Sequence, residues 1–83
     1  FVNLPFSIKG IHVCALFMER KDFVKISLRS HGDFAVNTIC AEHFKGGGHK
    51  NAAGGETKLS LNDAVKYFMN IMKEREHELK KLS

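Results

Sequence analysis

The chain has 83 residues, the size of one domain, and its net charge of +4 at neutral pH makes it mildly basic. No apolar run approaches the roughly 20 residues of a membrane-spanning helix, and two cysteines are too few for a disulfide framework. With 43% hydrophobic residues the chain can still build a core, so we expect a single domain over residues 1–83 with no membrane partner.

The first third of the chain predicts three strands. Residues 2–8 alternate apolar and polar positions, and Pro5, which lacks a backbone donor, confines this segment to a sheet edge or a connecting arm. Residues 11–18 are apolar on both faces, which predicts an interior strand covered on both sides. Residues 23–30 alternate strictly, which predicts a half-buried strand that pairs with the preceding one as an antiparallel hairpin.

Arg29 ends the polar face of the third strand, just before the turn Ser30-His31-Gly32. A guanidinium can hold a phosphate through two parallel hydrogen bonds. Taken alone, however, this position is better explained by an ordinary solvated arginine.

A helix is predicted over residues 33–44, because its apolar positions fall on one helical face and Asp33 stands where a cap is needed. Cys14 and Cys40 lie in apolar segments, which predicts buried free thiols. Cys40, His43 and His49 are three potential zinc ligands, whereas structural zinc sites use four, so we predict no metal site.

Five of the seven glycines fall within residues 46–55, around His49. Glycine loses more backbone entropy on folding than any other residue, so such a cluster needs a reason. Successive N–H groups of residues 46–48 can converge on a phosphate oxygen, and the imidazole of His49 can add a donor. A flexible loop or a tight packing contact is the alternative, but the histidine and the following Ala-Ala-Gly-Gly favour an anion site.

Residues 55–59 predict a short strand, and the segment from Ser60 to Asp63 has the form of a capping box that opens a last helix. The charge run over 73–81 is typical of a solvated helix end. The predicted buried stripe of this helix consists of Leu61, Ala64, Val65, Phe68, Ile71 and Met72. Together the elements predict an α/β domain of two layers, with a mixed β-sheet and two main helices at about 33–44 and 60–80.

The pattern Ser27-Leu28-Arg29-Ser30, a helix-like stretch, Gly46-Gly47-Gly48-His49 and Ala52-Ala53-Gly54 resembles the C-terminal, DHH-associated domain of the DHH phosphoesterases. The resemblance runs from about residue 11 to residue 71. This superfamily includes RecJ exonucleases, oligoribonucleases that also dephosphorylate pAp, and cyclic-dinucleotide phosphodiesterases. The sequence is most similar to the members near the oligoribonuclease branch.

The resemblance implies the substrate-binding half of a metal-dependent phosphodiesterase or phosphatase, with no catalytic residue of its own. Arg29 and Ser30 would contact a substrate phosphate, and the glycines with His49 would line the opposite wall. His49 would also stabilise charge that develops during hydrolysis, while Asn51 is explained equally well by a structural turn. The predicted substrate-binding residues are Arg29, Ser30, Gly46, Gly47, Gly48, His49 and Asn51.

The Asp-His-His motif of the family is absent, and the three aspartates, Asp22, Asp33 and Asp63, are far apart in the sequence. A two-metal phosphoesterase site needs several converging carboxylates or histidines. We therefore expect a fragment, inactive alone, of a longer cytoplasmic enzyme whose N-terminal DHH domain binds Mn²⁺ or Mg²⁺. Expected substrates are short oligonucleotides, pAp or products of cyclic dinucleotides, and a homodimer of the parent enzyme is compatible with the resemblance.

Two alternatives remain open at this stage. A RecJ-like exonuclease would need a longer basic path lined with aromatic residues to bind single-stranded DNA. A non-enzymatic nucleic-acid-binding module, similar to the C-terminal domain of alanyl-tRNA synthetases, would have little use for a pocket that fits a single phosphate. Arg29, placed before the turn, favours the phosphoesterase interpretation.

Overall fold

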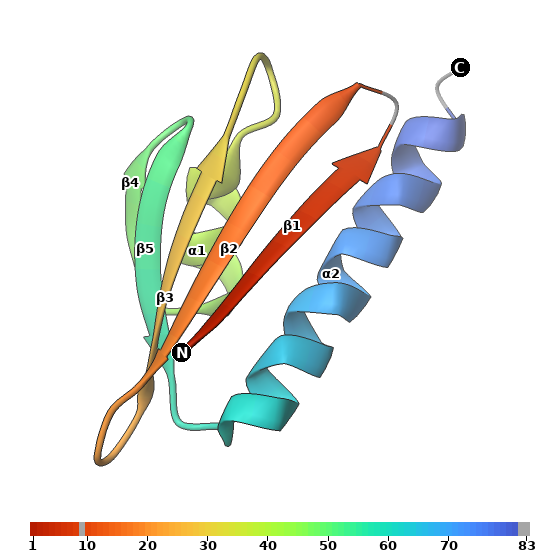
Figure 1. The fold of residues 1–83 in the computed structure, drawn as a ribbon. Helices are drawn as coiled ribbons and strands as arrows, with labels where there is room; N and C mark the ends of the chain where they lie inside the picture. The colour runs from red at the N-terminus through yellow and green to blue at the C-terminus, as the bar shows by residue number, and fades with distance from the viewer. Residues whose placement is uncertain (9, 82–83) are drawn as a thin grey trace.

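The structure is a computed structural model that describes residues 1–8 and 10–81, and in these residues five strands and two helices form two layers (Figure 1). The strands are β1 (Val2–Ile8), β2 (Ile11–Glu19), β3 (Val24–Ser30), β4 (Gly47–His49) and β5 (Ala52–Thr57). The helices are α1 (Val36–His43) and α2 (Leu61–Lys81). The sheet has the order β1-β2-β3-β5-β4. The two-layer α/β prediction is confirmed.

Every pair of neighbouring strands among these residues is antiparallel, so the prediction of a mixed sheet is wrong. Helix α1 carries the chain from β3 to β4, which runs in the same direction as β3. The chain then turns back as β5, and β5 lies between β3 and β4. No two strands with the same direction are therefore neighbours in the sheet.

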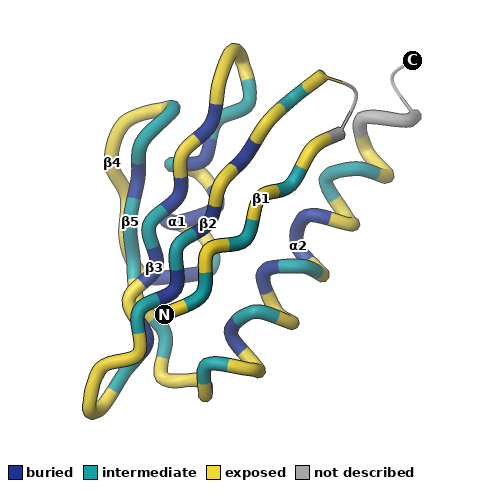
Figure 2. The backbone as a smooth tube through the Cα atoms, in the orientation of Figure 1, coloured by how far each residue is buried: buried dark blue, intermediate teal, exposed yellow. Residues whose placement is uncertain are grey.

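One hydrophobic core lies between the sheet and the helices, and alternate strand residues face it (Figure 2). Helix α1 contacts β3, β4 and β5, while α2 contacts β2. At the centre, the rings of Phe17 and Phe68 pack edge to face, with centroids 5.7 Å apart and an angle of 73°. Because residues of both helices belong to this one cluster, both helices pack on the same face of the sheet and leave the other face open.

The prediction that residues 11–18 are covered on both sides is wrong, because the described residues cover only one face of β2. On the open face His12 and Cys14 are exposed, whereas Leu16 and Met18 are half-buried. The predicted burial of Cys14 is wrong for the same reason. Cys40 is fully buried in the core as predicted, and this burial raises the pKa of its thiol above the ordinary value of 9.0.

Helix α1 begins at Val36, three residues after the predicted start, and Asp33 does not cap it. Its N-cap residue makes no side-chain hydrogen bond; instead, the Val36 N–H donates to the carbonyl of Lys50 at 2.8 Å. Helix α2 has the predicted cap, since the Asp63 N–H donates to Ser60 Oγ at 3.2 Å. Its predicted stripe is confirmed: four of the six residues are buried and the other two pack against the core.

Strand β5 begins at Ala52, earlier than the predicted 55–59, and β4 occupies part of the segment predicted as a glycine loop. Alanine and glycine have low intrinsic strand propensity, so local sequence does not indicate these strands. Backbone pairing of β5 with both β3 and β4 holds them in the sheet.

Truncation of the central aromatic pair tests this core. We expect Phe68→Ala to lower the free energy of unfolding by about 3–5 kcal/mol, because it leaves a cavity beneath Phe17. The matched control Lys66→Ala lies on the exposed side of the same helix and should change it by less than about 0.5 kcal/mol. Urea denaturation followed by circular dichroism measures both, and similar values for the two variants would contradict the packing of Phe68 against Phe17.

Candidate functional site

The strand register places Arg29 and His49 in one row across the sheet. Arg29 lies opposite Ala52, and Ala52 lies opposite His49. Directly opposed residues of antiparallel strands point to the same face, so both side chains are on the open face. Two strand spacings, about 10 Å, separate their backbones. The structure thus brings these two predicted site residues together, side by side on one surface rather than on opposite walls.

Between Arg29 and His49 the side chains rise little above the backbone, because the residues there are small. Ala52 lies directly between them, and in the adjacent row Gly54 pairs with Gly47. A Cβ atom added to Gly47 would have no atom within 4 Å, so this glycine is not required by packing. A ligand can approach the backbone closely at this position.

The predicted convergence of three backbone amides does not form. Residues 47–49 are an extended edge strand, in which successive N–H groups alternate in direction. The N–H of Gly46 donates to the carbonyl of Cys40 at 3.0 Å and so completes the end of α1. The glycine segment therefore presents an open strand edge rather than an anion nest.

Close packing explains three of the clustered glycines. A Cβ on Gly46 would collide with the carbonyl of Gly54, and one on Gly55 would lie 2.5 Å from the carbonyl oxygen of Phe44. Gly48 has a φ of 142°, which side chains rarely adopt, and its Cβ would lie 2.8 Å from the carbonyl oxygen of Ala52. At these three positions the tight packing contact, weighed as the alternative, is the observed role.

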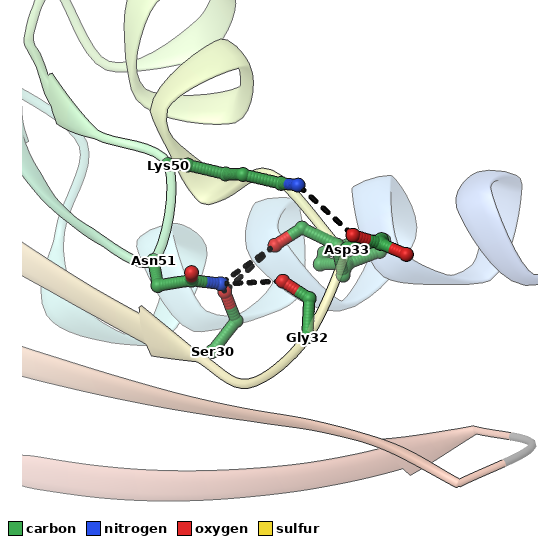
Figure 3. A network of polar contacts seen from close by, with 6 residues as sticks. Ser30, Gly32, Asp33, Lys50 and Asn51 are labelled. Carbon is green, nitrogen blue, oxygen red and sulfur yellow. Dashed lines mark hydrogen bonds and ion pairs between the residues drawn. The ribbon is translucent and has the colours of Figure 1, made fainter.

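Ser30 and Asn51 hold the loop that follows β3 (Figure 3). Asn51 Nδ2 donates to Ser30 Oγ at 2.9 Å and to the carbonyl of Gly32 at 3.0 Å. Ser30 is 7% exposed and lies on the helix side, and its hydroxyl donates to the carbonyl of Phe34 at 2.7 Å. Both side chains are thus used within the loop, and the direct phosphate contacts predicted for them stay a prediction.

Lys50, which the sequence analysis did not single out, connects the same turn to α1. Its carbonyl accepts the N–H of Val36, and its Nζ lies 3.1 Å from Asp33 Oδ1 (Figure 3). Because both side chains are exposed, this ion pair contributes little to stability. The backbone contact, rather than the charge, joins the turn to the helix.

Arg29 and His49 are available to an anion. Arg29 Nη1 donates to the carbonyl of Leu28 at 3.0 Å, and within the described residues no carboxylate pairs with either side chain. On β5, Glu56 lies opposite Lys25, at the other end of β3 from Arg29. A phosphate placed here would meet positive and hydrogen-bonding groups without a competing negative charge.

The three potential zinc ligands are not brought together. Cys40 is buried in the core, His43 Nδ1 lies 3.0 Å from the hydroxyl of Tyr67, and His49 is on the open face. Across residues 1–8 and 10–81, no three His, Cys, Asp or Glu side chains gather as metal ligands.

Sequence reasoning missed a groove of about 310 Å³ that lies beside Arg29. Its outward-facing residues come from β1, β2 and the end of β3, and the loop after β3 and the turn before β5 complete it. Pro5 and Ser7 are two residues apart in the sequence, as are His12 and Cys14, and this spacing places each pair on one face of a strand. This alternation was the signal in the sequence that could have indicated the groove.

Comparison with known proteins identifies the family. The sequence model of the DHHA1 domain family matches residues 1–75 of the chain. The chain belongs to the DHHA1 domain family. A crystal structure of an exopolyphosphatase-related protein from Bacteroides fragilis is similar to this DHHA1 domain, with a TM-score of 0.77 and 42% sequence identity over 89% of the chain. The match spans 22% of that protein, so the DHHA1 domain corresponds to about a fifth of it.

A search of the curated proteins found no match. The predicted DHH-associated domain is confirmed, whereas a place near the oligoribonuclease branch stays a prediction. No helix in the described part of the chain combines the length and the apolar character needed to cross a membrane.

The division of the glycines into packed and open positions can be tested by alanine substitution. We expect Gly46→Ala to lower the free energy of unfolding by about 1–3 kcal/mol, because the new methyl group meets the β5 backbone. Gly47→Ala should be neutral or stabilising by up to about 1 kcal/mol, since it meets open space and restricts the unfolded chain. Thermal denaturation compares them, and a destabilised Gly47→Ala variant would contradict the assignment.

Asn51 and Lys50 form a second matched pair. Asn51→Ala removes the amide that donates hydrogen bonds to Ser30 Oγ and to the carbonyl of Gly32. We expect this variant to lose about 1–3 kcal/mol in the free energy of unfolding. Lys50→Ala removes only the exposed ion pair and should cost less than about 1 kcal/mol. Equal costs in denaturant titrations would show that the amide does not hold the loop.

Proposed function

We propose that this DHHA1 domain binds the phosphate group of a nucleotide substrate between Arg29 and His49, as the substrate-binding domain of a DHH-family phosphoesterase. The observation that carries the proposal is the shared row of these two side chains on the open face, with only Ala52 between them. Membership of the DHHA1 family supports it.

The two side chains have complementary chemistry. The planar guanidinium of Arg29 can donate two parallel hydrogen bonds to phosphate oxygens. The imidazole of His49 can donate a third from the opposite side, and the bare backbone at Gly47 leaves room for the phosphate. In our proposal Ser30 and Asn51 act indirectly, because their hydrogen bonds hold the loop that follows Arg29.

We propose that a second domain of the parent chain, the DHH domain, covers the open face and closes a cleft over the substrate. The described residues of this chain offer no metal-ion site, so Mn²⁺ or Mg²⁺ would be held by the DHH domain. Short cytoplasmic substrates such as oligonucleotides of a few residues, pAp or products of cyclic dinucleotides suit this arrangement. Within the described residues, the outward strand positions carry no Phe, Tyr or Trp, which argues against a long stacking path of the RecJ type.

Titration of the chain with a nucleoside 5′-monophosphate, followed by amide chemical shifts, tests the proposal. We expect binding at roughly millimolar Kd, since half of the cleft is absent. Arg29→Ala and His49→Ala should each weaken binding by about tenfold, which corresponds to about 1.4 kcal/mol.

Lys25→Ala is the matched control, because it removes one positive charge from the same face of the same strand at its far end. It should leave the affinity nearly unchanged. Equal weakening in the Lys25 and Arg29 variants would show that only general charge attraction is present, and the phosphate site would be rejected.

A further inference from the structure

The groove lies beside Arg29, over the end of β1 and the start of β2, and its lining extends to Ser30 and Asn51. Its volume of about 310 Å³ falls at the lower end of the range typical of small-molecule sites. Arg29 forms part of its wall and part of the phosphate site, so the two spaces are continuous at this side chain. The groove is lined by Pro5, Ser7, His12, Cys14, Arg29 and His31, among others.

The lining combines an apolar surface with the hydrogen-bonding side chains of serine and histidine. Pro5 and Cys14 face each other across β1 and β2 and form an apolar floor. Ser7 Oγ lies 2.9 Å from His12 Nδ1, which orients the imidazole, and the His31 N–H donates to the His12 carbonyl at 3.3 Å. Among the described residues that line the groove there is no Asp or Glu. Nucleosides present a flat apolar ring with polar edges, which matches such a surface.

We infer that this groove binds the nucleoside attached to the phosphate that Arg29 holds; this inference rests on the proposed function of the site. A groove that binds the nucleoside makes the domain selective for nucleotides over inorganic phosphate and polyphosphate. A polyphosphate chain requires a succession of positive groups, whereas among residues 1–8 and 10–81 Arg29 is the only Arg or Lys that lines the groove. The substrate therefore crosses the strands, with its phosphate between Arg29 and His49 and its nucleoside over β1 and β2.

The first experiment compares three ligands on the chain: inorganic phosphate, tripolyphosphate and adenosine 5′-monophosphate. We expect the nucleotide to bind at least tenfold more tightly than either inorganic ligand, in titrations followed by amide chemical shifts. Cys14 provides a second measurement, because it lines the groove while the other cysteine, Cys40, is fully buried. The nucleotide should slow alkylation of Cys14 by iodoacetamide, and inorganic phosphate should not.

A variant that fills the groove distinguishes binding in the groove from binding at the phosphate site. Ser7→Trp places a large ring in the groove from the exposed edge strand β1, and it should remove the advantage of the nucleotide while the affinity for inorganic phosphate is unchanged. The control Met18→Trp lies on the same face of the sheet, on β2 outside the groove lining, and should keep the advantage. Circular dichroism confirms that both variants are folded.

The outcomes distinguish this inference from the proposed phosphate site. If phosphate and nucleotide bind equally, with both depending on Arg29 and His49, the groove inference is overturned and the phosphate site stands. A preference for tripolyphosphate, or an unchanged nucleotide advantage in Ser7→Trp, also overturns the groove inference. If no ligand depends on Arg29 or His49, the proposed function itself fails.

Discussion

The turn at Lys50 and Asn51 is the contact on which the arrangement of the open face depends. It joins the end of β3, the loop that follows and the start of α1, through two backbone carbonyls and one side-chain amide. The same turn connects β4 to β5 and so sets the register in which Ala52 lies opposite both Arg29 and His49. Two side chains twenty residues apart in the sequence become neighbours because this short turn is held from three directions.

The glycine segment has two physical roles that the sequence presents as one motif. Gly46, Gly48 and Gly55 allow backbones to approach so closely that a methyl group would collide with a neighbouring strand or loop. Gly47 alone among the four faces open space on the outer surface. The packing of β4 and access to the proposed site therefore both depend on missing Cβ atoms, but at different positions.

The placement of both helices on one side gives the sheet its functional asymmetry. The inner face is filled by one hydrophobic core, and the outer face carries the cationic and hydrogen-bonding side chains with no helix above them. A surface of this kind suits a substrate that is enclosed from the other side by a second domain. The phosphate site and the groove share this face, with Arg29 between them.

Local patterns in the sequence determined the elements whose signals lie within a few residues. The hairpin of β2 and β3, the cap at Ser60 and the buried stripe of α2 follow from period-two or helical spacing, and Arg29 is recognisable at the end of a polar strand face. The family could also be identified from the residue string around Gly46 to His49. These features depend on short-range geometry, which sequence spacing describes well.

Only the tertiary structure decided which strands became neighbours and which face the helices covered. The insertion of β5 between β3 and β4 made the sheet antiparallel throughout its described residues, and the uncovered face exposed Cys14. Contacts between distant segments also decided that the inward-facing Ser30 hydroxyl binds the loop and that Arg29 and His49 share a row. These outcomes depend on contacts between distant segments, and such contacts leave no periodic signal in the chain that forms them.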